Sequence, residues 1–238
     1  MTHNPAKIST GIPPLDEILL QSIAHGVIRL EHLLSDYGGE RRRLRILKLR
    51  GSSFMGGMHD IRLMRGGLKV FPREASDQDP VATETHVVES GNVAFDELLG
   101  GGLNAGTSAL LLGPAGVGKT SMVLQFAIHA TNRGERAILF QFEESDQSLF
   151  VRAEGLGFDL RGHVDSGLVE IVNLTPGEIT TSQFACLVRR SVQPDSHGRH
   201  VTIVAIDSLN GYLNSMPHED FLIIQLHELL QYLSKRSV

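Results

Sequence analysis

The sequence predicts an α/β fold built on a central parallel sheet. From residue 107 to residue 233, short apolar runs alternate with helical patterns, as in units whose strands run parallel. A glycine-rich loop separates the first apolar run from the first helical pattern, and an aspartate directly follows the last apolar run. An acidic stretch with few apolar residues, 73–84, divides this region from a β-rich front part.

The front part is expected to be a β-hairpin. Residues 44–50 and 61–71 are rich in strand-forming residues, and a loop with two adjacent glycines joins them. We expect no helix in this part beyond a short one near residues 15–22.

The back part begins with a strand, a loop and a helix. Residues 107–112 form an apolar run that ends in the glycine loop, which predicts a buried strand. Met122, Phe126 and Ala130 have helical spacing, and they predict a helix over residues 120–132. The elements that follow continue the alternation, with Ser145 as the N-cap of the second helix. The further expected strands are 136–142, 168–174 and 201–206, and the further expected helices are 145–154, 181–192 and 219–233.

Composition excludes several classes of protein. The 238 residues allow one domain or two small ones, and 41% hydrophobic with 21% charged residues is ordinary for a soluble globular chain. No apolar run reaches the roughly 20 residues that span a bilayer. Residues 1–9 lack the apolar stretch of a signal peptide, and Cys186 is the only cysteine, so no internal disulfide is possible. We therefore expect a soluble, cytoplasmic protein.

The charge distribution argues against DNA as a partner. The net charge is −5, and aromatic residues, which stack on bases, make up only 5% of the chain. Residues 40–50 are nevertheless strongly basic. They are either a binding surface for nucleic acid or phosphate, or the solvated face of a hairpin.

The strongest chemical signal is a complete phosphate-binding motif, G-x-x-x-x-G-K-[ST]. Backbone N–H groups of such a loop surround phosphate oxygens at a helix N-terminus, the lysine reaches the β- and γ-phosphates, and the hydroxyl binds Mg²⁺. The predicted nucleotide-binding residues are Gly113, Pro114, Ala115, Gly116, Val117, Gly118, Lys119 and Thr120.

Three carboxylates follow predicted parallel strands, whose C-terminal ends meet at the ligand crevice. Asp207 follows the last strand and is predicted, with Thr120, to organise Mg²⁺. Glu143 and Glu144 follow residues 136–142, and at least one of them is predicted to activate the nucleophile. The alternative for the pair is a solvated acidic pair that favours the dipole of the next helix.

A short repeat relates the two parts of the chain. Residues 9–19 and 89–99 share a glycine, a three-residue spacer, a bulky apolar residue, Asp-Glu, an apolar residue and leucine. This opening motif, the glycine loop, Glu143-Glu144 and Ile206-Asp207-Ser208 together resemble one domain of the KaiC family of RecA-like ATPases. Residues 47–51 and 67–73 resemble the terminal hairpin of such a domain.

The resemblance implies more than the residues do alone. It implies hexameric rings of tandem RecA-like domains, ATP bound between subunits, slow hydrolysis and, in some members, Ser/Thr autophosphorylation and circadian timing. Glu143 and Glu144 match the family's catalytic pair. Lys48 and Arg50 match a basic pair that reaches the nucleotide of the adjacent subunit.

The expected organisation has three parts. Residues 1–73 are the remnant of a first KaiC-like domain, 74–87 an acidic linker, and 88–238 a KaiC-like P-loop ATPase domain that is incomplete at its C-terminus and lacks the phosphorylatable segment. The expected function is binding of Mg²⁺ and ATP with hydrolysis, by a homo-oligomer that has partners in a clock or signalling system. The alternatives are a DNA-handling ATPase of the RecA-like group, and a non-catalytic module that ATP stabilises.

Overall fold

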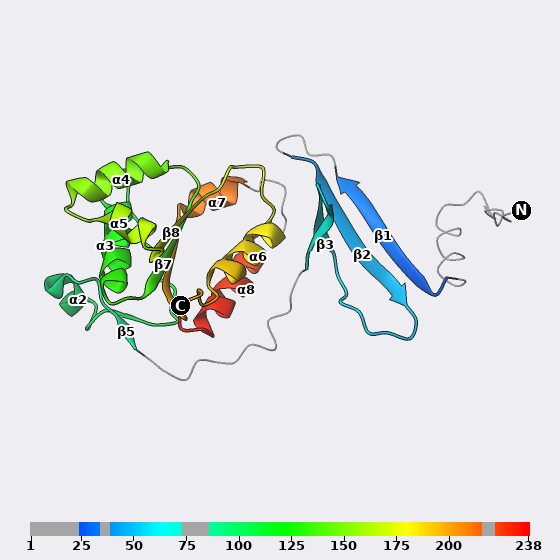
Figure 1. The fold of residues 1–238 in the computed structure, drawn as a ribbon, viewed down its shortest axis with the longest axis horizontal. Coiled ribbons are helices and arrows are strands. Elements are labelled where there is room, and N and C mark those ends of the chain that lie inside the picture. The colour runs from blue at the N-terminus through cyan, green and yellow to red at the C-terminus, as the bar shows by residue number, and fades with distance from the viewer. Residues whose placement is uncertain (1–23, 34–38, 73–85, 216–221) are drawn as a thin grey trace, which may run out of the picture. The chain divides into compact units, whose positions relative to one another are not determined.

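The structure is a computed structural model that describes residues 24–33, 39–72, 86–215 and 222–238 (Figure 1). The chain forms two compact units, each described here by itself. The front unit comprises Met1–Asp36 and Glu40–Arg73, and the back unit comprises Tyr37–Gly39 and Glu74–Val238. The expected helix and the first copy of the opening motif, both within residues 1–23, lie outside the described residues.

The described part of the front unit is one antiparallel sheet in the order β1-β2-β3-β4. The expected hairpin is therefore flanked by one further strand on each side. The strand expected over 61–71 is two strands, because the chain reverses at Arg65 and Gly66, where the φ of 105° at Gly66 suits glycine. Its strands are β1 (Gly26–Leu33), β2 (Arg41–Leu49), β3 (His59–Met64) and β4 (Gly67–Phe71).

The back unit confirms the expected parallel α/β fold. Strands β7, β8 and β9 form a parallel sheet in the order β8-β7-β9. The expected N-cap Ser145 accepts a hydrogen bond from the backbone N–H of Ser148. The elements are β5 (Val87–Val88), α2 (Val93–Leu98), β6 (Leu103–Asn104), α3 (Lys119–Asn132), β7 (Arg136–Gln141), α4 (Asp146–Gly155), α5 (Leu160–Asp165), β8 (Val169–Asn173), α6 (Thr181–Ser191), β9 (Val201–Asp207), α7 (Leu209–Ser215) and α8 (Leu222–Ser234).

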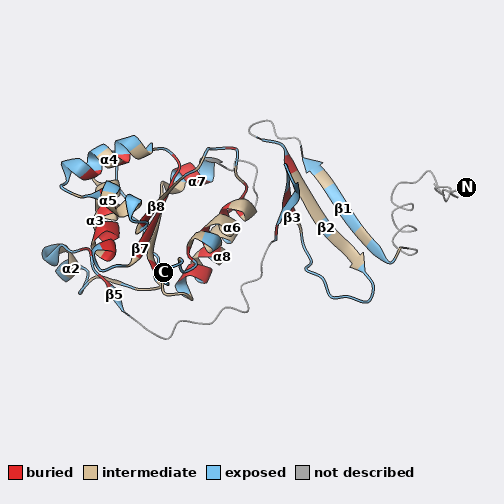
Figure 2. Cartoon of the chain, viewed as in Figure 1, coloured by how far each residue is buried: buried red, intermediate tan, exposed pale blue. Residues whose placement is uncertain are grey.

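Strand β7 is buried over its whole length between two helical layers (Figure 2). Its side chains alternate between the two faces of the sheet. Ala137 and Leu139 pack in a core with residues of α3, α4 and α5, whereas Ile138 and Phe140 pack in a core with residues of α6, α7 and α8. The same division is visible in Figure 1, with α3, α4 and α5 on one side of the sheet and α6 and α8 on the other.

The strand predicted over residues 107–112 is absent, and this prediction was wrong. The segment has no strand assignment, and Leu110 and Leu112 are 64% and 82% exposed. An apolar run becomes a strand only when a neighbouring strand accepts its backbone hydrogen bonds. Among the described residues, no strand pairs with residues 107–112, so their backbone groups join no ladder and the run stays irregular.

None of the helices in the described part of the chain combines the length and the hydropathy that crossing a membrane would take.

Candidate functional site

The glycine loop lies directly before α3 and has a conformation that depends on glycine. Gly116 and Gly118 have φ values of 80° and 101°, in the left-handed region that side chains with a Cβ rarely adopt. Gly118 is the N-cap of α3 and offers no side chain to cap it. The first backbone N–H groups of α3 therefore have no intrahelical partner, and this helix start is suited to an anion.

Lys119 closes the loop in the structure. Its Nζ donates to the carbonyl oxygens of Gly113 and Pro114, each at 2.9 Å. The ammonium group is thus held over the loop backbone by carbonyl groups at the start of the loop. A phosphate group in the loop would meet this cation directly.

Thr120 connects the loop to the sheet. Its Oγ1 donates to Oδ2 of Asp207, the last residue of β9, at 2.6 Å. Hydroxyl and carboxylate oxygens are the ligands that Mg²⁺ prefers, and Mg²⁺ commonly takes only one or two from the protein, with water and substrate phosphates supplying the rest. The donor set therefore fits the predicted Mg²⁺ site.

Glu143 lies beside Asp207 because β7 and β9 are neighbours. The backbone N–H of Phe142 donates to the carbonyl of Asp207 at 2.9 Å. Ser208 Oγ donates to Glu143 Oε1 at 2.9 Å and accepts from the backbone N–H of Gly211 at 3.0 Å. The direction of both bonds is fixed, since an N–H only donates and the hydroxyl proton is left for the carboxylate.

Gly211 allows this close approach. A Cβ at this position would lie 2.5 Å from Cβ of Phe142 and 3.2 Å from Oε1 of Glu143. The start of α7 therefore packs against the end of β7 at backbone distance. That contact places Ser208, which precedes α7, against the Glu143 carboxylate.

Glu144 has a different environment from its neighbour. Its Oε1 accepts from Ser148 Oγ and from Arg152 Nη2, both at 2.6 Å. Burial raises the pKa of Glu144, but the hydrogen bonds from Ser148 and Arg152 outweigh burial and hold the pKa below its usual range. Glu144 is therefore a charged acceptor tied to α4, with its Oε1 engaged by two donors.

A pocket of about 260 Å³ opens next to the loop. It is lined by four polar side chains, three apolar side chains and one glycine. Gly118 and Ser121 connect it to the end of the glycine loop. Its lining residues are Ser90, Asn92, Phe95, Gly118, Ser121, Met122, Gln125 and Leu156.

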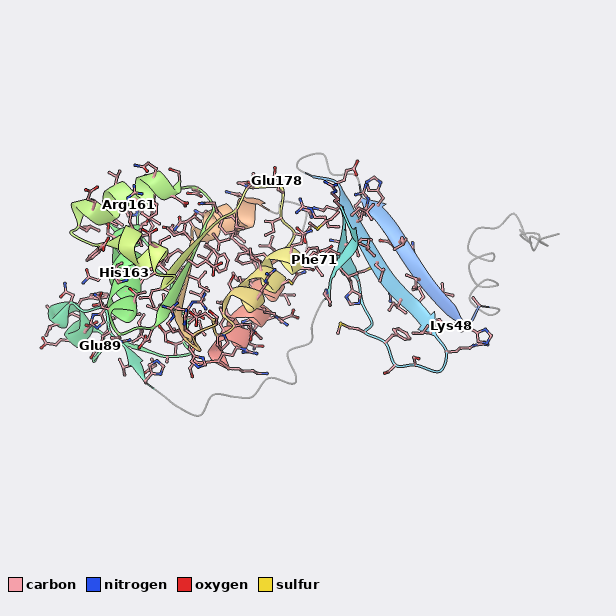
Figure 3. All side chains as sticks on the ribbon, in the orientation of Figure 1. Lys48, Phe71, Glu89, Arg161, His163 and Glu178 are labelled. Carbon is pink, nitrogen blue, oxygen red and sulfur yellow. The ribbon has the colours of Figure 1, made fainter. Side chains whose placement is uncertain are left out.

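The structure brings most of the predicted site residues into the back unit. Four of these features lie together where β7 and β9 end: the glycine loop, Thr120, Asp207 and Glu143. Glu144 directs its carboxylate to α4. Lys48 is in the front unit at the end of β2 (Figure 3), and Arg50 follows it. Their predicted role stays a prediction.

Sequence reasoning missed Ser208 and Gly211 as parts of the site. Ser208 stood in the motif that carries the family resemblance but was given no role there, and Gly211 had only its position four residues after Asp207 as a signal. A serine and a glycine after a strand are ordinary turn residues, so their meaning depends on the contact with β7.

A glycine-rich phosphate-binding loop at a helix start, joined to a carboxylate at the end of a parallel strand, defines the class as a P-loop nucleotide-binding protein. Residues 88–238 match the family model described as the KaiC ATPase. The chain belongs to this family, and the resemblance read from the sequence is confirmed.

Curated relatives agree with the family match. The circadian clock oscillator protein KaiC of Synechococcus elongatus is 32% identical over 201 residues, which cover 84% of this chain and 37% of that protein. The protein of the same name from Acaryochloris marina is 32% identical over 185 residues, 77% of this chain and 34% of that protein. The chain thus spans little more than a third of the length of these relatives.

Proposed function

We propose that the back unit binds Mg²⁺ and ATP and hydrolyses the nucleotide. The observation that carries the proposal is the 2.6 Å bond between Thr120 and Asp207, which joins the start of α3 to the strand end beside Glu143. Family membership supports ATP as the nucleotide.

Each residue has a distinct part in the proposal. The loop amides and Lys119 hold the phosphates, and Thr120 and Asp207 hold Mg²⁺, which would neutralise charge on the β- and γ-phosphates. Glu143 orients the attacking water and accepts its proton. Its carboxylate suits this part because Ser208 fixes one of its oxygens, whereas Oε1 of Glu144 is engaged by Ser148 and Arg152.

The pocket beside the loop suits the base of the nucleotide. Phe95, Met122 and Leu156 offer apolar contact, and Ser121 and Gln125 offer polar groups. Because Gly118 and Ser121 belong both to the pocket and to the start of α3, phosphates in the loop would leave the base within reach of it.

Lys119→Ala tests the proposal. The variant loses the only cation of the loop segment 113–120, and we expect most ATP affinity to disappear in isothermal titration with Mg²⁺ and ATP. Since Nζ of Lys119 contacts only exposed carbonyl groups, the far-ultraviolet circular dichroism spectrum should not change. Unchanged affinity in a folded variant would refute the assignment of the loop.

The two glutamates separate binding from chemistry. We expect Glu143→Gln to bind ATP normally and to lose hydrolysis by about 10²–10⁴-fold, the usual contribution of a general base. The matched control is Glu144→Gln, which makes the same change one residue away and should keep a larger share of the activity. Equal rates in the two variants would contradict the division of roles.

The proposal extends to assembly between subunits. We propose that Lys48 and Arg50 act on the nucleotide of a neighbouring copy in a homo-oligomer. In related enzymes, a cation supplied from outside the loop raises the rate of phosphoryl transfer on the order of 10³–10⁵-fold. Chains carrying Lys48→Ala and Arg50→Ala should regain hydrolysis when mixed with Lys119→Ala chains. Full activity of the double variant alone would leave the pair without a catalytic role.

The names of the relatives connect them to circadian timing, and for this chain a regulatory ATPase in a clock or signalling system is a proposal. We further propose that residues 1–73 derive from a sister domain and that 74–87 link it to residues 88–238. ATP labelled at the γ-phosphate distinguishes two activities in one assay. Label released as phosphate indicates hydrolysis, and label retained on the protein indicates autokinase activity.

A further inference from the structure

The sheet of the front unit has two chemically different faces. Residues paired across neighbouring antiparallel strands point to the same face, so the register assigns each side chain to one of the two. Ile28 pairs with Ile46, Leu30 with Leu44, Ile61 with Val70 and Leu63 with Leu68. The pairing of Arg42 with Ile61 and of Leu44 with His59 places these pairs on one face. We call this the apolar face: Ile28, Leu30, Leu44, Ile46, Ile61, Leu63, Leu68 and Val70.

The opposite face carries most of the charge of the sheet. Basic side chains outnumber acidic ones on it, and we call it the basic face. It includes Arg29, Glu31, Arg41, Arg43, Arg45, Asp60, Arg62 and Lys69. On the apolar face, by contrast, the charge of Arg42 is balanced locally. Nη2 of Arg42 lies 2.6 Å from Oε2 of Glu40, and Nε2 of His32 lies 3.3 Å from the same oxygen.

The apolar face is largely exposed in the structure. Leu30, Leu63 and Ile28 are 66%, 60% and 59% exposed, and Leu68 and Val70 are exposed as well, whereas Ile61 on the same face is 7% exposed. Within residues 24–33 and 40–72, the described part of this unit, the chain forms a single layer with no helix on it. An antiparallel sheet normally packs one face on a core, so this face is suited to a partner.

We propose that the apolar face is a self-association surface, on which the same face of a second copy packs to form a two-layer sandwich. Two such faces are complementary to each other because both are apolar at the centre. Face-to-face packing places the two sheets about 10 Å apart and leaves both basic faces in solvent, where salt screens their repulsion. Contact through the basic faces would instead bring like charges together without water between them.

The size of the face predicts a weak dimer. Four strands about 4.8 Å apart and some six residues long, at about 3.3 Å per residue, cover on the order of 400 Å². Two such faces total about 800 Å², below the roughly 1,200 Å² that stable specific interfaces bury and in the range of weak, transient contacts. We therefore expect association that depends on protein concentration and needs no nucleotide, which makes it independent of the proposed ATPase site.

Paired lysine substitutions on the two faces test the proposal. Leu30→Lys with Leu63→Lys alters β1 and β3 on the apolar face. The matched control, Leu33→Lys with Met64→Lys, adds the same charge to the same two strands on the basic face. Sedimentation velocity of the full chain without nucleotide should run from about 1 μM to about 1 mM, the range of weak complexes. We expect the parent and the control to dimerise, and the apolar-face variant to bind at least about tenfold more weakly, because it buries unpaired ammonium groups.

A second measurement guards against a variant that fails to fold. In a Cys186→Ser background, Leu30→Cys should form dimers with a thiol cross-linker, and Leu33→Cys should form far fewer. The proposal is overturned if the parent stays monomeric over the whole range, if both lysine variants lose association equally, or if cross-linking favours Leu33→Cys.

Discussion

Replacing Gly211 by alanine sets two physical effects against each other. Gly211 belongs to α7, and alanine at a helical position is favoured over glycine by about 1 kcal/mol. The added Cβ, however, would lie 2.5 Å from Cβ of Phe142 and 3.2 Å from Oε1 of Glu143. Cβ of Phe142 is attached to the backbone of a buried segment, so no change of rotamer relieves the clash.

The steric effect should win. Overpacking a close-packed site costs about 1–3 kcal/mol, and subtracting about 1 kcal/mol of helix propensity leaves a loss of about 0–2 kcal/mol. Because the clash joins two Cβ atoms, which cannot rotate away, we expect the upper half of that range, about 1–2 kcal/mol. For a unit of this size, that loss lowers the melting temperature by about 2–8 °C. Hydrolysis should fall as well, because the clash displaces the carboxylate that Ser208 holds.

Thermal unfolding followed by near-ultraviolet circular dichroism measures the effect, since Tyr212 and Tyr232 pack in the core of the back unit. Gly155→Ala is the matched control. Gly155 is also helical, and a Cβ there meets nothing within 4 Å, so this variant should be as stable as the parent or slightly more stable. If Gly211→Ala gains as much stability as Gly155→Ala, the contact between α7 and β7 is not as tight as described and the reasoning fails.

Three further predictions concern single side chains. Ser208→Ala removes the hydrogen-bond donor to Glu143, and we expect kcat to fall by about tenfold, as expected for the loss of one hydrogen bond to a charged group. ATP affinity measured by calorimetry should not change. An equal loss of affinity would assign Ser208 to binding. Because the pKa of Glu144 is lowered in the folded state, its ionised carboxylate stabilises the fold at pH values above its ordinary pKa of 4.5. This contribution disappears as the pH falls through the folded-state pKa. The melting temperature of Glu144→Gln should therefore fall less in acid than that of the parent. Burial raises the pKa of Asp195, but hydrogen bonds from Arg199 and from the backbone of His197 outweigh burial and lower this pKa to about 2. A carboxyl resonance of Asp195 that titrates near 4 in NMR would contradict these contacts.

The sequence predicted those features that depend on neighbours in the chain. The glycine loop was predicted because the motif fixes residue types at fixed spacings, and the structure begins α3 at the lysine of that motif. Strand β7 and helix α6 were predicted within one or two residues, because their patterns of apolar residues repeat with the period of the element.

The features that were missed depend on contacts between distant segments. Residues 107–112 have the composition of a buried strand, but a strand needs a partner, and composition does not say whether one is there. Strand β1 was missed although Ile28-Arg29-Leu30-Glu31 alternate between apolar and charged residues, because so short a run is a weak signal until the pairing with β2 is known. The role of Ser208 depends on its hydrogen bond to the carboxylate of Glu143, 65 residues earlier in the chain.

The two adjacent glutamates have different hydrogen-bond partners in the structure, although the sequence does not distinguish them. Glu143 and Glu144 have the same chemistry and follow the same strand, but the chain bends at Phe142 and Glu143 before α4 begins, and the two side chains reach different partners. One carboxylate meets Ser208 beside Asp207, and the other meets Ser148 and Arg152 of α4. The first is therefore coupled to the end of β9, where the nucleotide is proposed to bind, while the second fixes α4 against the end of β7. An exchange of the two environments would require the chain to rotate at the strand end, which the bond between Phe142 and Asp207 opposes.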